Sequence, residues 1–385
     1  MSPSTTAPSD TRIECQSSDS FSHWLSQLPG SLAVTTYQAG KLALLGWRDK
    51  QPSLLMRQFD KPMGLAVGPG KLALATRHEI SLFADAPLLA RDFMPEQPAR
   101  YDALYLPRAT YHTGDVNVHD VAFGEEGLWF VNSRFSCLSG LSKDFSFVPR
   151  WQPPFISELV PEDRCHLNGL ALVNGKPKYV TALGETDTVG GWRDNKPSGG
   201  VLIDVETNTV VLRGLSMPHS PRWHQGRLCL LNSGAGELLC FDPSTGTAGV
   251  ICTLPAYLRG LSLIGRYAVI GMCQIREKHI FGDLPVQKRC DKLLCGLAAV
   301  DLPTGQLVGM FEFTSGCTEL YDVQFLPGTR CPNILNSADK SSKQAFTAPD
   351  FSYWLRPENV IPESQSQSDT GECRDPSQLL ASIVP

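Results

Sequence analysis

The sequence predicts an all-β fold: a six-bladed β-propeller in which an N-terminal segment completes the C-terminal blade. Three observations predict it. A short apolar phrase occurs six times, strand-like runs follow each copy, and the last copy lacks strands that an N-terminal segment can supply. Repetition at a spacing of tens of residues is typical of propellers and other repeat architectures.

The repeated phrase marks the first strand of each blade. Its copies start 40 to 62 residues apart, and a four-stranded propeller blade needs about 40–45 residues. The longer gaps indicate insertions at 86–118 and 272–295. A sandwich or two stacked barrels would not explain this spacing. The copies are MGLAV (63–67), HDVAF (119–123), NGLAL (168–172), HSPRW (219–223), RGLSL (259–263) and YDVQF (321–325).

In the sixth unit the strand-like pattern ends within about ten residues of YDVQF (321–325). The strands that are missing from this unit lie at the other end of the chain. The segment SLAVTTYQAGKLALLG (31–46) matches the second and third strands of the fourth unit, LCLLNSGAGELLCFD (228–242). SLLMRQF (53–59) then supplies a fourth strand. We therefore expect the N-terminal segment to close the ring without an open sheet edge, which is a hazard for association with other chains.

The ends of the chain differ in composition from the repeats. Residues 1–20 and 337–385 are rich in polar residues and Pro, so we expect a disordered N-terminal tail, a propeller at 21–336 and a mostly disordered C-terminal tail. FSHWLSQLP (21–29) is expected to be a short helix with Trp24 and Leu25 facing the domain.

Composition excludes several classes of partner. The chain has 385 residues, a net charge of −5 and 19% charged residues, which argues against a nucleic-acid partner, since such a surface is basic. No apolar run is long enough for a transmembrane helix, so no membrane partner is expected. The first residues lack the features of a signal peptide, so we expect a cytoplasmic protein. No phosphate-loop pattern occurs, and no nucleotide cofactor is expected.

The residue that leads each phrase varies, and in a propeller it points toward a common centre. The leading residues are Met63, His119, Asn168, His219, Arg259 and Tyr321. Two residues earlier, on the same side of an extended strand, stand Lys61, Asn117, His166, Met217, Tyr257 and Glu319. The sequence thus predicts a polar site at the mouth of the central channel.

Three histidines and a carboxylate at this mouth suit a divalent transition metal, with Zn, Fe, Mn or Cu as candidates. The predicted ligands are His119, His166, His219 and Glu319. Two alternatives remain open: a site without metal, and a channel that hydrogen-bonded histidines simply close. The Gly-rich loop 184–200, with Trp192 at its centre, is expected to be a lid over the channel or a surface excursion.

Other polar residues near the mouth have expected roles in binding or catalysis. Arg222 and Arg259 are expected to bind an anionic group, because guanidinium matches carboxylate well. Asn117 and Asn168 are further candidates for substrate binding. Tyr321, Asp322 and Asp120 are candidates for acid–base catalysis. The segment PEDRCHLNG (161–169) adds Asp163 and Arg164, for which an ion pair with each other is an equal alternative to a functional role.

Several segments resemble an uncharacterised bacterial family of conserved hypothetical proteins with a domain of unknown function, sometimes fused to tetratricopeptide repeats. The segments include PEDRCHLNGLA (161–171), GLSMPHSPRW (214–223) and LRGLSLIGRYAVIG (258–271). The resemblance covers roughly residues 20–336 and implies a propeller-type domain, but it brings no reaction. A weaker resemblance is to lactonase-type six-bladed propellers, which hold a divalent cation with oxygen ligands; histidines here favour a softer metal.

The sequence therefore supports two hypotheses of different kinds. The first is a metal-dependent enzyme, a hydrolase or an oxidoreductase, acting on a small molecule or peptide at the channel mouth. The alternative is a non-catalytic propeller that binds a protein or peptide partner across its face.

Overall fold

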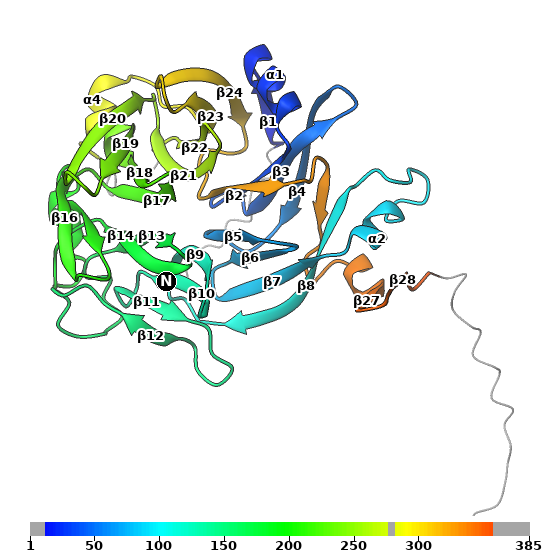
Figure 1. Ribbon diagram of the computed structural model, residues 1–385, viewed down its shortest axis with the longest axis horizontal. Coiled ribbons are helices and arrows are strands. Elements are labelled where there is room, and N and C mark those ends of the chain that lie inside the picture. Colours follow the sequence, from blue (N-terminus) through cyan, green and yellow to red (C-terminus); the bar gives the residue numbers. More distant parts are fainter. Residues whose placement is uncertain (1–11, 276–281, 357–385) are drawn as a thin grey trace, which may run out of the picture.

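The computed structural model describes residues 12–275 and 282–356, and these residues form a ring of six antiparallel sheets around a common centre (Figure 1). The predicted six-bladed β-propeller is confirmed. The first three blades are β5 (Leu65–Gly68), β6 (Lys71–Ala75), β7 (Glu79–Asp85) and β8 (Ala103–His112); β9 (Val118–Gly124), β10 (Gly127–Asn132), β11 (Cys137–Gly140) and β12 (Val148–Trp151); β13 (Leu167–Val173), β14 (Lys176–Ala182), β15 (Gly200–Asp204) and β16 (Thr209–Leu215).

In each blade the first-named strand lies nearest the centre. The other three blades are β17 (Pro218–His224), β18 (Arg227–Asn232), β19 (Glu237–Asp242) and β20 (Thr247–Thr253); β21 (Tyr257–Ile264), β22 (Tyr267–Cys273), β23 (Gly296–Asp301) and β24 (Gln306–Ser315); β25 (Val323–Pro327), β2 (Gly30–Thr36), β3 (Lys41–Arg48) and β4 (Gln51–Gln58).

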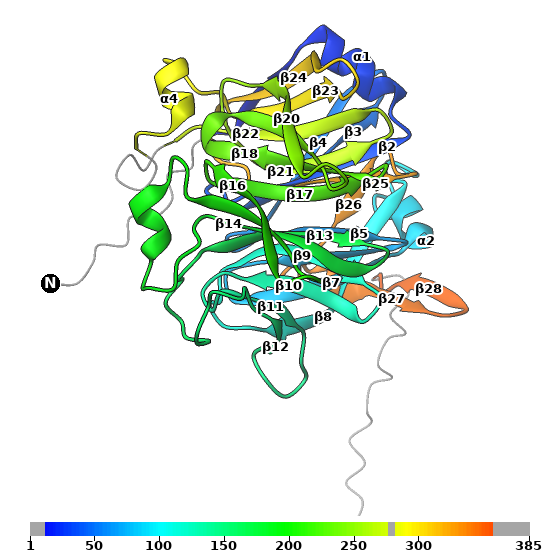
Figure 2. The ribbon, with the colours of Figure 1, turned by 60° about the vertical axis from the view of Figure 1, so that its left-hand side comes forward.

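The sixth blade joins the two ends of the repeat region, as the sequence predicts. β25 pairs with β2 in antiparallel register, with Leu32 opposite Phe325 and Val34 opposite Val323. Figure 2 shows β25 beside β2 from a second direction. All seven residues of β2 are buried, because both faces of this strand are covered inside the ring.

The 86–118 segment, expected as an insertion, also supplies the outer strand of the first blade. β8 pairs with β7 along most of its length, and only the short helix α2 (Pro87–Arg91) and the turns after it leave the blade. The strand was missed because this excursion separates it from β7. In the 272–295 segment the structure describes α4 (Pro285–Arg289), and residues 276–281 lie outside the described part.

The chain packs against the propeller before residue 21, where a tail was expected. β1 (Glu14–Ser17) adds an outer strand to the fifth blade by pairing with β24. Helix α1 (Asp19–Gln27) follows, capped by the Ser18 hydroxyl and burying Phe21, Trp24 and Leu25. Residues 1–11 are not among those described. β1 was missed because it contributes backbone pairing rather than an apolar pattern.

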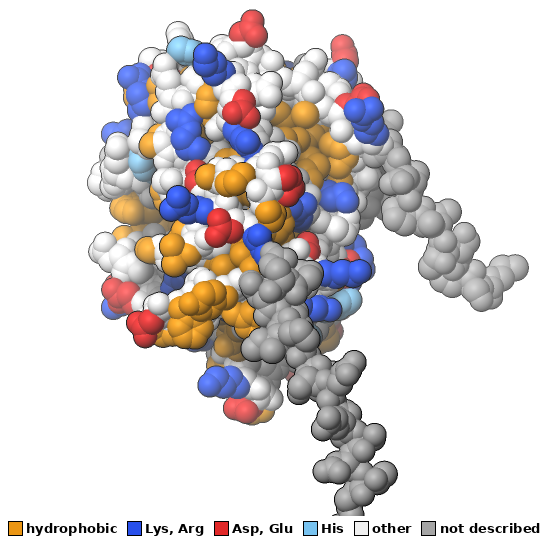
Figure 3. All heavy atoms as spheres, turned by 90° about the vertical axis from the view of Figure 1, so that its right-hand side faces the viewer, with side chains coloured by type: hydrophobic (Ala, Val, Ile, Leu, Met, Phe, Trp, Pro, Cys, Tyr) orange, Lys and Arg blue, Asp and Glu red, His pale blue; other side chains and the backbone are white. Residues whose placement is uncertain are grey.

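Residues after 336, expected as a tail, also contain structure. The hairpin of β27 (Ala345–Ala348) and β28 (Phe351–Trp354) follows a short 3₁₀ helix (Ser341–Gln344). Just before it, within the expected propeller span, β26 (Pro332–Ile334) runs parallel to β8. The Trp354 indole donates to the carbonyl of Leu89 in α2. Hydrophobic side chains gather on this side of the molecule (Figure 3), including the exposed Phe346 and Phe351. Residues 357–385 of the expected tail lie outside the described residues.

No helix within 12–275 and 282–356 is both long and apolar enough to span a membrane.

Candidate functional site

The backbone just before four of the inner strands takes an uncommon conformation. Lys61, Asn117, His166 and Met217 stand at the same place in blades one to four, and their φ angles lie between 46° and 57°. Only a few per cent of non-glycine residues adopt this left-handed conformation. The inner strands β9, β13, β17 and β21 also shift register where the phrase begins. Such bulges re-aim side chains near functional sites.

His119 and His219 are held by the same arrangement in two blades. His119 Nδ1 lies 2.9 Å from the carbonyl oxygen of Asn117 and 2.7 Å from the Ser133 hydroxyl. His219 Nδ1 lies 2.9 Å from the carbonyl oxygen of Met217 and 3.1 Å from the Ser233 hydroxyl. Because a carbonyl only accepts hydrogen bonds, each Nδ1 carries the proton, and each Nε2 carries a lone pair.

His166 lies beside His119 and is held by Asp163. Its Nδ1 is 2.8 Å from Asp163 Oδ1, and its Nε2 is 3.0 Å from His119 Nε2. Asp163 also accepts from the Trp192 indole at 3.0 Å. The Trp192 ring packs 4.6 Å from the His166 ring, so the 184–200 loop, through its 3₁₀ helix (Gly191–Asn195), reaches the channel mouth.

These contacts limit where the protons lie. The Ser133 hydroxyl donates to the Leu167 carbonyl, so it accepts from His119 Nδ1–H. A hydrogen bond between His119 Nε2 and His166 Nε2 needs one proton between the two atoms. His166 Nδ1 lies against the Asp163 carboxylate, which can only accept a hydrogen bond from it.

The electrostatics agree with this assignment. Burial lowers the pKa of His119 well below its usual value, and the positive charges of His166 and Arg259 add to the effect. Burial and the Arg259 charge likewise lower the pKa of His219. Burial alone would raise the pKa of Asp163, but the charge and hydrogen bond of His166 outweigh it and lower that pKa.

Arg259 and two tyrosines complete the site. The Arg259 guanidinium lies 5.3 Å from the ring centroid of Tyr257 and 5.2 Å from that of Tyr321. The Tyr321 ring lies 5.4 Å from the His119 ring. Burial raises the pKa of Tyr321 well above its usual value, although Arg259 opposes the shift, so its hydroxyl is protonated at neutral pH. We call His119, His166, His219, Tyr257, Arg259 and Tyr321 the central cluster.

Arg222, Asp120 and Asp322 form a separate group on the inner strands. Arg222 Nη1 lies 2.8 Å from Asp120 Oδ2, and Arg222 Nη2 lies 3.3 Å from Asp322 Oδ1. Burial and the nearby Asp120 raise the pKa of Asp322 to about 7, against the opposing charge of Arg222. Arg222, expected to bind substrate, is thus engaged by the two carboxylates expected to act in catalysis. We call these three residues the Arg222 cluster.

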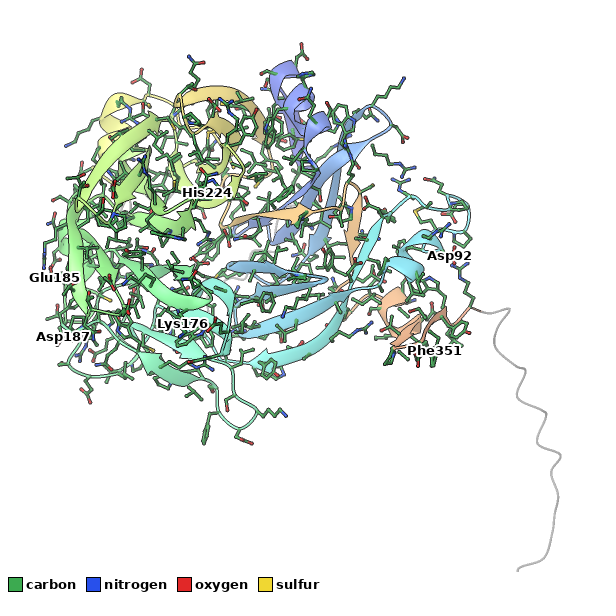
Figure 4. All side chains as sticks on the ribbon, in the orientation of Figure 1. Asp92, Lys176, Glu185, Asp187, His224 and Phe351 are labelled. Carbon is green, nitrogen blue, oxygen red and sulfur yellow. The ribbon has the colours of Figure 1, made fainter. Side chains whose placement is uncertain are left out.

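The Arg222 cluster also contacts the inner strands of the other three blades. These contacts are Leu65 N–H to Asp322 Oδ2 at 3.0 Å, Leu170 N–H to Asp120 Oδ2 at 3.0 Å, and Arg222 Nε to the Leu261 carbonyl at 3.2 Å. Farther along the same strands is a cavity of about 340 Å³, lined by residues of all six blades that include Arg222 and His224. His224 is labelled in Figure 4.

The remaining predicted residues have other placements. Asn117 contributes its backbone carbonyl to His119. The Asn168 side chain accepts from the Thr181 hydroxyl at 2.8 Å, which links β13 to β14. Glu319 acts on Arg259 electrostatically, as one of the groups that raise its pKa against the effect of burial. Within residues 12–275 and 282–356, no group of three or more His, Cys, Asp or Glu side chains is arranged to hold a metal ion.

Sequence reasoning missed two contributors to the site and left the role of a third, Asp163, open between an ion pair with Arg164 and a function. Ser133 and Ser233 each stand fourteen residues after a cluster histidine, in the similar segments VNS (131–133) and LNS (231–233), and this repeat was a usable signal. Asp163 serves His166 rather than Arg164, which pairs with Glu162 and Asp187 at 2.8 and 2.9 Å. Asp187 is labelled at the edge of the third blade in Figure 4.

Comparison with known proteins identifies the family. A family model described as a domain of unknown function, DUF4915, matches residues 19–335. The chain belongs to this family. The DUF4915 match ends just before the hairpin of β27 and β28 and includes both the central cluster and the Arg222 cluster. No curated protein matches the chain.

Two solved structures are similar to this DUF4915 protein. A chain in the crystal structure of a nidogen/laminin complex is 12% identical, with a TM-score of 0.51; the match covers 77% of this chain and 98% of that one. A protein of unknown function from Bacteroides caccae is 10% identical, with a TM-score of 0.49 and coverage of 77% and 99%. At 12% identity, the similarity to the chain of the nidogen/laminin complex shows the fold alone.

Proposed function

We propose that the protein is an enzyme acting on a small anionic molecule or a peptide at the central cluster. One observation carries the proposal: the hydrogen-bond chain Asp163–His166–His119 links a carboxylate to two imidazoles through contacts of 2.8 and 3.0 Å. General acid–base chemistry needs titratable groups of one site in different protonation states.

Two further groups of the central cluster are available to a substrate. His219 Nε2 and the Tyr321 hydroxyl are buried, and neither has a hydrogen-bond partner among the described residues. Unsatisfied buried polar groups are costly, and a catalytic role is one reason that they are retained. In the proposed reaction His219 Nε2 accepts a proton from the substrate or from water. His166 Nε2–H or the Tyr321 hydroxyl donates a proton to the departing group.

Arg259 supplies the charge that holds the substrate. Its pKa is raised above the usual value because Tyr257, Tyr321 and Glu319 outweigh the effect of burial, so it is always cationic. A buried guanidinium between two aromatic rings presents its N–H groups in a fixed plane, which suits a carboxylate or phosphate. Burial also excludes water, which strengthens this attraction.

A metal-dependent form of the same function is the second candidate. It is favoured by the 3.0 Å separation of His119 Nε2 and His166 Nε2, with both Nδ1 atoms held by acceptors, as is usual for ligating histidines. Zn, Fe, Mn or Cu would then be held by these two residues and would supply a Lewis acid.

Untargeted mass spectrometry of a metabolite and peptide extract incubated with the protein tests the enzymatic proposal. We expect time-dependent loss of at least one anionic compound with the wild type and with the control His224→Gln, whose histidine lies outside the central cluster. His166→Gln and His219→Gln should lose this turnover. Stoichiometric retention of a compound or protein without turnover would overturn the proposal in favour of a binding module, and so would turnover that survives both substitutions.

Elemental analysis of protein purified without an affinity tag separates the two forms. A stoichiometric transition metal that is lost in His119→Ala/His166→Ala would support the metal-dependent form. Turnover by protein that contains no metal would exclude it.

A further inference from the structure

A cavity of about 1430 Å³ lies beside the central cluster, between the sixth and first blades. The β2–β3 turn, the β4–β5 connection and the β6–β7 turn all contribute to its lining. Tyr37, in the first of these turns, places its ring 5.9 Å from the Tyr321 ring of the central cluster. The Tyr37 side chain therefore lies between the cavity and the central cluster.

Lys61 is the residue of the first blade that corresponds to Asn117 and His166 in the next two. It stands two residues before the repeated phrase and has the same left-handed backbone, with φ of 46°. Its ammonium lies 5.4 Å from the Tyr37 ring centroid. Lys61 thus extends the ring of polar groups around the channel into the cavity.

The charges lining the cavity are predominantly positive. They are Arg12, Lys41, Lys61, Arg77, Asp60 and Glu79. One carboxylate is engaged, since Asp60 pairs with Arg77 at 3.1 Å, and the other, Glu79, lies 3.6 Å from the exposed His112. Lys41 bonds the neutral Gln58 amide oxygen at 2.5 Å. Among the described residues, neither Lys41 nor Lys61 has a carboxylate partner, so their charges are available to an anion.

We propose that this cavity binds the anionic extension of a ligand that carries two or more carboxylate or phosphate groups. This inference rests on the proposed function and names the class of its substrate. One anionic group of the ligand lies at Arg259, and its other anionic groups lie at Lys61 and Lys41. In this proposal the ligand passes alongside Tyr37, whose ring lies 5.9 Å from that of Tyr321. Acidic peptides and polyphosphates share this chemistry.

Isothermal titration calorimetry of the full-length protein with tripolyphosphate and, separately, with a hexaglutamate peptide tests the inference. We expect the wild type to bind at least one probe, and the stronger probe indicates whether phosphate or carboxylate is the source. Lys61→Gln and Lys41→Gln should each weaken binding about tenfold, as expected for loss of one charge-assisted contact. The matched control is Lys176→Gln, which removes the same charge at the exposed β13–β14 turn and should leave the affinity unchanged.

Absence of binding to both probes, or equal affinity in Lys61→Gln/Lys41→Gln and the wild type, would overturn the inference. A different result would contradict the proposed function. His166→Gln should retain probe binding while it loses turnover, and turnover that persists in His166→Gln contradicts the catalytic role without affecting the cavity.

Discussion

Asp163 controls the central cluster through a single side chain. It accepts from His166, from the Trp192 indole and, at 3.5 Å, from Arg193. Three donors around one carboxylate stabilise its charged form, and burial is outweighed so that the pKa of Asp163 is lowered. The hydrogen bonding of a histidine at the channel mouth therefore depends on this carboxylate.

Asp163→Asn should change the hydrogen bond at His166 Nδ1, because an amide replaces the carboxylate that lies 2.8 Å from this nitrogen. Ring ¹⁵N chemical shifts of histidine-labelled protein measure this directly. Asp187→Asn is the control, since Asp187 pairs with Arg164 and not with His166. Unchanged His166 shifts in Asp163→Asn would contradict this hydrogen bond.

Asp322 should make stability depend on pH near neutrality. Its pKa is about 7 in the folded protein and about 3.9 in an unfolded chain, so between these values the folded state binds the extra proton. The stabilisation is complete below about pH 4 and is lost as pH rises through 7. Thermal unfolding from pH 5 to 8 should therefore show a steeper loss of stability with pH in the wild type than in Asp322→Asn.

Asp301→Asn is the comparison for this experiment. Arg266 and Thr304 lower the pKa of Asp301 to about 2, so its removal should not change the slope between pH 5 and 8. Equal slopes in the wild type and Asp322→Asn would show that Asp322 is ionised throughout this range.

At the scale of the elements, the sequence predicted the inner strands because their apolar pattern repeats locally in every blade. It also predicted that residues leading the phrase meet at the centre. It did not predict which adjacent residue joins which group. His119 joins the central cluster while Asp120 bonds Arg222, because the register shift in β9 turns the two side chains apart. Such shifts depend on pairing between strands and leave no residue signature here.

The loop after β14 is the element whose role the sequence left open. Trp192 is 4% exposed, and it contacts both Asp163 and His166. We expect Trp192→Ala to destabilise the protein by about 3–5 kcal/mol, the usual cost of truncating a buried Trp. Trp192→Phe keeps the ring but removes the indole donor and should lose activity with a much smaller loss of stability. Chemical denaturation measures the loss of stability, and the turnover assay measures the loss of activity. Equal destabilisation by Trp192→Ala and Trp192→Phe would contradict separate roles for the packing of the ring and for its indole hydrogen bond.

At the scale of the whole molecule, the Arg222 cluster connects all six blades near the axis. Asp322, Asp120 and Arg222 come from the sixth, second and fourth blades and bond the strands of the first, third and fifth. The Arg222 side chain is 18% exposed and the two carboxylates are 6% and 4% exposed. Their position in the ring was predictable from the repeat, but their mutual pairing required the closed structure.

Arg222→Met should destabilise the protein by about 3–5 kcal/mol, because it leaves two buried carboxylates without their cation. Adding Asp120→Asn and Asp322→Asn to Arg222→Met should recover part of this loss, since the uncompensated charges are then removed. Equilibrium unfolding in urea measures both. A triple variant no more stable than Arg222→Met would show that the cost lies in packing rather than in charge.

The pairing of β2 with β25 determines when the sixth blade can form during synthesis of the chain. Residues 30–58 leave the ribosome early, yet the strand that completes their sheet, Val323–Pro327, is made nearly three hundred residues later. Until then the apolar β2 presents an unpaired edge, which is prone to pair with other chains. The other blades can form in order as they emerge, but the sixth can close only after Val323–Pro327 has been made. Protection of this edge by a chaperone would be needed only during that interval.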